Sequence, residues 1–413
     1  MTSGPAAPHT SSAASVFWVF LKLGLTSFGG PVAHLAYFRT ELVQRRQWMS
    51  EAAYAQLVAL CQFLPGPTSS QVGMAMGLQR AGLPGMAAAW LGFTLPSALA
   101  LALLGVGLVH LGSGVPSGVL QGLKIAAVAV VFHAVWGMAQ QLCPDRARKL
   151  VLLLGLAMSL AVSGFVGQLG VLLMGGLWGW WWLGRHGSRG SVSAVDSTPA
   201  PNSAPTISRP LALSCLAVLV GLLLCLPLWA QHSAQPLLQV VDTFFRTGAL
   251  VFGGGHVVLP LLQAELVQPG WVDANTFVAG YGATQAVPGP LFTFAAFLGS
   301  VMPAAPSLLS SLAYAAVAVL AIFAPSFLLV VGVWPFWQQV QQHQSVQHAL
   351  QGINAAVVGL LAAVLIQPMA LGTLHNPQDM LLCLAAIVAL KSWRWAPWLV
   401  VAACASLGWL VLT

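Results

Sequence analysis

The sequence repeats one pattern of helix-breaking residues in its two halves. An FGG motif at residues 28–30 recurs at residues 252–254, and a PGP motif at residues 65–67 recurs at residues 288–290. A basic residue before FGG, an ELVQ segment and a tryptophan after it, and a glutamine before PGP also match in the same order. Chance explains such an ordered match poorly, so the chain is predicted to fold as two homologous halves.

Apolar segments restrict the fold class further. The 413 residues are 58% hydrophobic and only 6% charged, which is more apolar surface than a water-soluble domain can cover. The stretches 85–110, 117–141 and 211–230 each suit a membrane-spanning helix, which needs about 20 apolar residues. The sequence therefore predicts an all-α polytopic membrane protein.

The composition also divides the chain into segments. Residues 184–210 are rich in Ser, Pro and Ala and lack apolar periodicity, which is typical of a flexible linker. We expect a first repeat at 15–183, this linker on the cytoplasmic side, a connecting transmembrane helix at 211–231, and a second repeat at 236–413.

Charge predicts how the two repeats are oriented. Arg39, Arg45 and Arg46 follow the first FGG motif, whereas the matching segment 265–273 has no Lys or Arg. Cytoplasmic loops of membrane proteins are enriched in these cations, so the two segments should face opposite sides of the membrane. One odd span between like halves produces this arrangement, and the sequence predicts inverted-topology repeats with broken or re-entrant helices.

The paired breaks suggest an anion site. Proline removes a backbone donor, and the residue before proline is biased away from helix, so each PGP motif should end one helix and begin another. A break at membrane depth is tolerated where it is buried in protein or lines a cavity. Glycine lets backbone N–H groups converge, which suits anions. Close helix packing through small residues is the alternative explanation for each glycine.

Several side chains near the breaks are candidates for substrate binding. Lys22 and Arg246 lie in apolar runs, where a cation is costly, although either could snorkel to an interface. Gln62 and Gln285 could donate to a ligand. Thr68 adds a hydroxyl at the start of the next helix, where capping of that helix is the alternative role.

Four further residues are candidates for proton coupling: His34, His256, Glu41 and Glu265. Histidine titrates near neutrality, but a lone histidine with a satisfied hydrogen bond is more common. For the two glutamates, surface ion pairs with nearby arginines are the alternative.

Catalysis has little support in the sequence. HExxH and GxSxG motifs are absent, as are paired aspartates in apolar spans, so an enzyme is not expected. The six cysteines form no CxxC pair, and we expect neither a metal site nor a cofactor. A membrane-embedded enzyme or a scaffold remains as the alternative from another class.

The sequence FGGPVAH, followed by QFLPGP and repeated as FGGGH with QAVPGP, resembles the chromate ion transporter family, in its long-chain form with two domains. The resemblance covers nearly the whole chain apart from the linker and the extreme termini. The resemblance assigns to the site the residues of the FGG and PGP motifs, with the glutamine before each PGP. Together with the residues selected above, the substrate-binding candidates are Lys22, Phe28, Gly29, Gly30, Pro31, Gln62, Pro65, Gly66, Pro67, Thr68, Arg246, Phe252, Gly253, Gly254, Gly255, His256, Gln285, Pro288, Gly289 and Pro290.

The resemblance implies export of chromate from the bacterial cytoplasm across the inner membrane, which gives chromate resistance. When a divalent anion leaves an inside-negative cell, the membrane potential contributes a favourable free energy of about twice 2.3 kcal/mol per 100 mV. Export can therefore be driven by the potential and needs no ATP. Sulfate or another tetrahedral oxyanion is the alternative substrate, and proton coupling stays open. The expected partners are the oxyanion and the lipid bilayer, without nucleic acid, and a homodimer is left open.

Overall fold

The computed structural model describes residues 12–111, 116–162, 164–183, 185, 207–233, 235–303, 307–336 and 343–411. Every regular element within these ranges is a helix, which confirms the all-α prediction. The predicted linker lies outside the described residues except at residue 185 and from residue 207 onward.

The first repeat contains short helices, two long helices and two π-helical segments. In chain order these are α1 (Ala13–Thr26), α2 (Gly30–Phe38), η1 (Arg39–Arg45), α3 (Glu51–Phe63), α4 (Thr68–Leu111), α5 (Ser117–Leu142), α6 (Arg146–Ala161), α7 (Phe165–Trp178) and η3 (Gly179–Leu183). The longest, α4, is kinked at Ala81 and Gly82, where the backbone leaves helical dihedral angles. Ahead of the second repeat runs α9 (Arg209–His232), which contains the predicted connecting span.

The second repeat follows the same order with more interruptions. Its elements are α10 (Pro236–Leu250), η4 (Gly255–Val257), α11 (Val258–Leu262), η5 (Gln263–Val267), α12 (Ala274–Thr284), η6 (Leu291–Thr293), α13 (Phe294–Ser300), α14 (Leu308–Val333), η7 (Trp334–Phe336), α16 (Gln344–Val364), η8 (Leu365–Ala370), α17 (Pro377–Lys391) and α18 (Pro397–Val411). The π-helical segments η1 and η5 both contain the matched ELV sequence, so even this irregular geometry is repeated.

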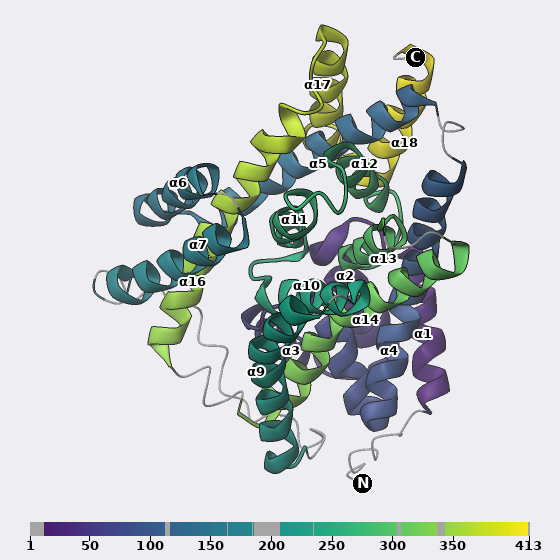
Figure 1. Cartoon of the computed structure of the whole chain (residues 1–413). Coiled ribbons are helices and arrows are strands. Elements are labelled where there is room, and N and C mark those ends of the chain that lie inside the picture. The colour runs from purple at the N-terminus through teal and green to yellow at the C-terminus, as the bar shows by residue number, and fades with distance from the viewer. Residues whose placement is uncertain are drawn as a thin grey trace.

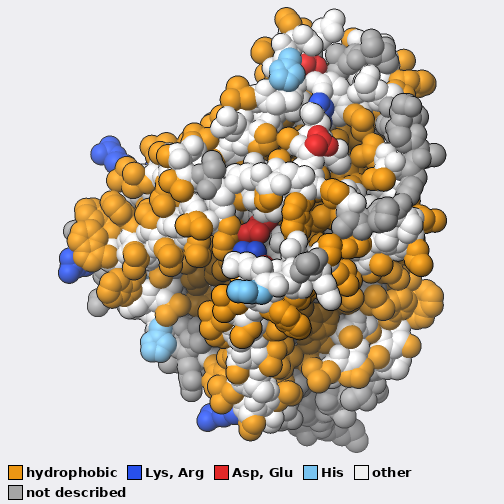
Figure 2. Space-filling view, viewed as in Figure 1, with side chains coloured by type: hydrophobic (Ala, Val, Ile, Leu, Met, Phe, Trp, Pro, Cys, Tyr) orange, Lys and Arg blue, Asp and Glu red, His pale blue; other side chains and the backbone are white. Residues whose placement is uncertain are grey.

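Five helices among the described residues are long and apolar enough to cross a membrane. They cover residues 68–109, 117–142, 209–232, 308–336 and 344–370. Figure 2 shows a face on which hydrophobic side chains dominate and charged side chains are few. The connecting helix α9 exposes Leu213, Leu224 and Leu228, as expected for a surface that faces lipid.

Equivalent helices pack in the same way inside each repeat. Helix α1 lies against α4, and α10 lies against α14. A Cβ atom built on Gly24 of α1 would lie 2.7 Å from the Phe93 carbonyl oxygen of α4. The matching residue of α10, Gly248, faces the carbonyl oxygen of Ile322 in α14. The absence of a side chain at this position permits close helix approach in both repeats.

Other helices are exchanged between the repeats. Helix α5 of the first repeat packs against α17 and α18 of the second, and α16 of the second packs against α6 and α7 of the first (Figure 1). The contacts match: Gly122 of α5 faces the backbone of Cys404, and Gly352 of α16 faces the backbone of Gly175. The molecule is therefore built from two homologous, inverted repeats with broken helices, as the sequence predicted.

Candidate functional site

Both FGG motifs form breaks between two helices. After α1 ends at Thr26, Gly29 and Gly30 adopt φ values of +100° and +80°, and α2 begins. After α10, Gly253 and Gly254 adopt +81° and +126° before the chain becomes helical again. These left-handed angles strongly favour glycine, which accounts for the paired glycines in each motif.

The two glycine breaks meet in space although they come from different repeats. A Cβ atom on Gly30 would lie 3.8 Å from Nε2 of His256 in the second motif. A Cβ atom on Gly255 would lie 3.1 Å from Cγ of Pro31 in the first motif. The structure thus brings the start of α2 against the start of η4, in the middle of the helix packing.

The PGP motifs join this centre through two reciprocal hydrogen bonds. The backbone N–H of Gly66 donates to the Val251 carbonyl oxygen at 2.7 Å, and that of Gly289 donates to the Ser27 carbonyl oxygen at 2.9 Å. Val251 and Ser27 directly precede the FGG motif of the opposite repeat. Each PGP break is therefore tied to the glycine break of the other half, and all four breaks converge.

Two serines that sequence reasoning did not select also enter this centre. A Cβ atom on Gly66 would lie 2.8 Å from Oγ of Ser326, and one on Gly289 would lie 2.7 Å from Oγ of Ser97. Both serines are buried and again belong to the repeat opposite the glycine. The repeated Pro-Ser pair in α4 and α14 was the signal in the sequence that could have identified them.

The matched polar side chains differ between the repeats. Gln285 is buried, whereas Gln62 is exposed. His34 is buried with Nδ1 3.3 Å from Oγ of Ser69, and Nδ1 of His256 lies 2.7 Å from the Tyr281 hydroxyl. The two halves therefore match in backbone geometry more closely than in side-chain chemistry.

The remaining candidates surround the breaks. Thr68 is buried at the start of α4, and Phe252 is half-buried in its motif. The ring of Phe28 lies 5.7 Å from the ring of Trp398 in α18, which is a contact between the repeats. Pro65 and Pro288 are half-buried, and Pro67 and Pro290 are buried.

Arg246 does not face the centre as an unpaired cation. Its guanidinium donates to both carboxylate oxygens of Asp242, at 2.9 and 2.8 Å, and to both oxygens of Glu265, at 3.0 Å each. It also lies 4.6 Å from the centroid of the Phe165 ring. Asp242 was not selected from the sequence, although an acid one helical turn before a buried arginine was a usable signal.

Lys22 occupies a different environment from its counterpart. It is exposed on α1, and it is close enough to Glu41 for their charges to interact. Glu41 itself accepts hydrogen bonds from Arg45 and Arg46 at 2.7 and 2.9 Å. The matched pairs Lys22 with Glu41 and Arg246 with Glu265 thus lie near each other in their repeats. The second of these pairs is in direct contact as an ion pair.

The centre offers backbone donors in apolar surroundings. The helices that begin at Gly30 and Gly255 have no side-chain cap, so their first N–H groups are left for other partners. Such N-termini carry partial positive charge and favour anions. Two-repeat membrane proteins with opposed broken helices around such a centre form a class of transporters.

Comparison with known proteins gives the family. The chromate transporter family model matches residues 14–180 and 238–409, which makes this chain a member of that family. Members of the family are transport proteins and not enzymes. No solved structure matches this chain.

Three relatives span most of this chain. A chromate transport protein from Cupriavidus metallidurans is 25% identical over 98% of this chain and 98% of its own length. A second from Pseudomonas aeruginosa is 28% identical over 87% of this chain and 82% of its own length. A probable chromate transport protein from Synechococcus elongatus is 27% identical over 91% of this chain and 88% of its own length.

Proposed function

We propose that this chain exports chromate from the bacterial cytoplasm across the inner membrane, with the anion held where the four helix breaks converge. The observation that carries the proposal is the reciprocal pairing of the breaks, in which Gly66 and Gly289 each donate to the opposite repeat. Membership of the chromate transporter family and relatives named chromate transport proteins support this substrate.

Backbone N–H groups supply the first part of the proposed anion site. The N-termini that follow Gly29 and Gly254 approach each other from the two repeats, so their partial positive charges act on one small region. Two buried side chains, the hydroxyl of Ser326 and the amide of Gln285, add groups that can donate to the oxygens of a tetrahedral anion. Neutral donors bind a dianion without the cost of a buried unpaired cation.

Charge and proton coupling enter through Arg246. Its guanidinium is already paired with two carboxylates, so a dianion gains from it only after one carboxylate is neutralised. Proton binding to Glu265 would release one side of the guanidinium toward the anion. His34 and His256 stay as the other proton-coupling candidates, because both lie within the helical turn after a glycine break.

The membrane potential supplies the driving force in this proposal. Arg146, Arg148 and Lys149 follow α5, whereas Lys391 ends α17 and Arg394 follows it. The distribution of basic residues assigns both clusters to the cytoplasm. With this orientation a dianion moves outward down an inside-negative potential, and each 100 mV contributes about twice 2.3 kcal/mol.

Flux in reconstituted vesicles tests the function. We expect labelled chromate to leave the face that carries the basic loops, and the rate to rise when that face is made negative with a potassium diffusion potential. The pH gradient is set independently, so that coupling to protons appears as a separate dependence. Empty vesicles are the control, and labelled sulfate tests the alternative oxyanion. Failure of this chain to move either anion above empty vesicles would refute the proposal.

A further inference from the structure

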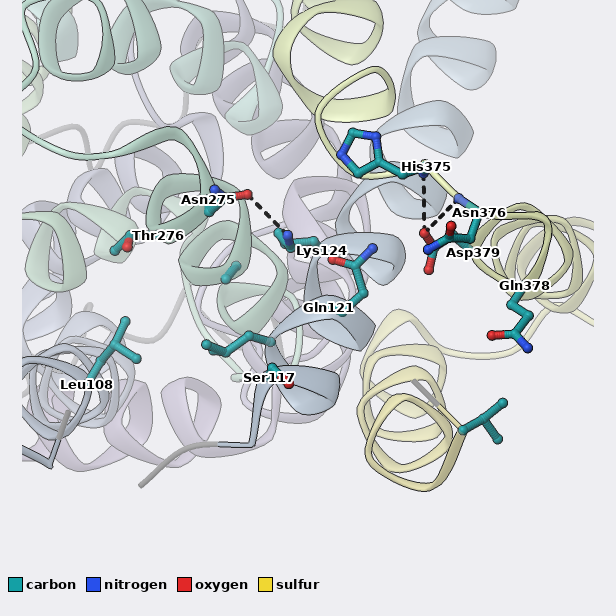
Figure 3. Close-up of a pocket in the computed structure, with 13 residues that line it drawn as sticks. Leu108, Ser117, Gln121, Lys124, Asn275, Thr276, His375, Asn376, Gln378 and Asp379 are labelled. Carbon is teal, nitrogen blue, oxygen red and sulfur yellow. Dashed lines mark hydrogen bonds between the residues drawn. The ribbon is translucent and has the colours of Figure 1, made fainter. Parts of the chain in front are cut away.

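A polar cavity lies away from the helix breaks. It has a volume of about 590 Å³, and it is open on one side and lined mainly by the start of α5, the start of α12 and the segment that leads into α17 (Figure 3). Its polar lining consists of Ser117, Gln121, Lys124, Asn275, Thr276, His375, Asn376, Gln378 and Asp379. No residue of the FGG or PGP motifs lines this cavity, so it is a separate feature of the molecule.

Among the residues that line this cavity, Lys124 carries the positive charge of a basic side chain. Its side chain is half-buried, and Nζ donates to Oδ1 of Asn275 at 3.1 Å (Figure 3). Asn275 is neutral, and an ammonium group has three donors, so donors remain for a ligand in the cavity. Gln121, one turn before Lys124, is held by a 2.7 Å hydrogen bond from Nε2 to the Thr373 carbonyl oxygen.

Asp379 lines the cavity and Asp273 directly precedes its lining residues Asn275 and Thr276, and backbone donors at helix starts engage both carboxylates. Asp379 is buried and accepts from the N–H groups of His375 and Asn376 at 3.2 Å each. Asp273 caps α12 and accepts from the N–H groups of Asn275 and Thr276. These N–H groups offset part of the negative charge of each carboxylate. The positive charge of Lys124 is not offset in this way, because its hydrogen-bond partner Asn275 is neutral.

The helix directions and the distribution of basic residues together predict that this cavity is on the outer side of the membrane. The cavity lies at the N-terminal ends of α5 and α17, and the basic clusters assigned to the cytoplasm lie at or just after the C-terminal ends of the same helices. The start of α12 also follows the segment 265–273, which lacks Lys and Arg. These three elements assign the cavity to the side opposite the cytoplasm.

We propose that this cavity is an outward-facing release site in which Lys124 binds the transported tetrahedral oxyanion. The inference rests on the proposed export of chromate. One cation opposed by two partly neutralised carboxylates gives weak binding, and weak binding is what a release site requires, because a transported ion must leave as well as enter.

Inhibition by external anion tests the release site. Chromate export from vesicles of defined orientation is measured while sulfate or chromate is added on the outer face, and the external concentration that halves the rate is determined. Lys124→Gln keeps a donor for Asn275 and removes the charge, so we expect that concentration to rise roughly tenfold. Asp273→Asn keeps a good helix cap and removes a negative charge, so we expect a change in the opposite direction.

Lys391→Gln is the matched control, because this lysine lies at the opposite end of α17 over the Trp136 ring. It should leave the external half-inhibiting concentration unchanged. The half-saturating concentration on the cytoplasmic face should be the same in all variants. An unchanged external value in both Lys124→Gln and Asp273→Asn overturns the release site while export by the parent protein still stands. Loss of export by the parent protein would instead refute the proposed function.

Discussion

At the scale of single residues, the PGP glycines are under the tightest constraint in the centre. Gly289 has φ of +107°, and a Cβ atom there would lie 2.7 Å from Oγ of Ser97. We expect Gly289→Ala to lower the free energy of unfolding by about 1–3 kcal/mol, because both the backbone angle and the space disfavour a side chain. Thermal unfolding of the purified protein in detergent measures the change.

Gly137→Ala provides the control for that substitution. Gly137 lies in α5, where an added Cβ atom would meet no neighbouring atom within 4 Å, and its backbone is helical. The variant should be as stable as the parent protein or slightly more stable, because alanine favours helix over glycine. Equal stability of the two alanine variants would contradict the packing described for Gly289.

The sequence predicted which residues match between the repeats, and less about what each residue contacts. The positions of Gly66 and Gly289 were predicted as breaks, and local chemistry was sufficient for that, because proline and glycine act on their own backbone. Their hydrogen bonds to Val251 and Ser27 join residues of different halves, and such partners depend on tertiary packing. The exposed side chain of Gln62 was likewise not predictable from its match with Gln285.

At the scale of elements, the ion pairs of Arg246 connect α10 to η5. We expect Arg246→Gln to destabilise the protein by about 3–5 kcal/mol, because Asp242 and Glu265 would be left partly buried without their cation. The triple variant Asp242→Asn, Arg246→Gln and Glu265→Gln removes all three charges and should recover much of the lost stability. Unfolding temperature and yield from membranes measure both effects.

Chromate flux of the triple variant separates structure from transport. We propose that Arg246 provides charge for the anion, so the stable triple variant should fail to export chromate. Lys22→Gln is the companion change, because Lys22 matches Arg246 in the first repeat. Since Lys22 is exposed, this variant should keep parent-level stability, and a loss of flux would show that the charge before the first glycine break also acts on the anion. Parent-level export by the triple variant would remove Arg246 from the anion pathway and leave it a structural role.

The element boundaries show which signals are local. The break before α4 was predictable from the PGP motif, and the span covered by α9 was predictable from its apolar length. The exchange of α6 and α7 onto α16 was not predictable, because it joins helices from different halves and the sequence carries no local signal for it. Asp242 is a different case, because its i,i+4 spacing from Arg246 is a local signal that was available in the sequence.

At the scale of the whole molecule, the inverted arrangement predicts opposite exposure of matched loop residues. Gln44 and Gln268 are equivalent positions at the ends of the ELVQ segments, and both are exposed. We expect Gln44→Cys to react with a membrane-impermeant maleimide from the cytoplasmic side, and Gln268→Cys to react from the outer side. The distribution of arginines gives the physical reason, because basic segments are retained in the cytoplasm.

The labelling requires a background without accessible thiols. Cys215 and Cys225 of α9 are the native cysteines that are not buried, so both are first replaced by alanine. Labelling after permeabilisation with detergent gives the total that each site can reach, and the sided fraction is expressed relative to it. Reaction of both positions from the same side would contradict the inverted orientation of the repeats. It would also remove the assignment of the Lys124 cavity to the outer face, because that assignment uses the same distribution of charge.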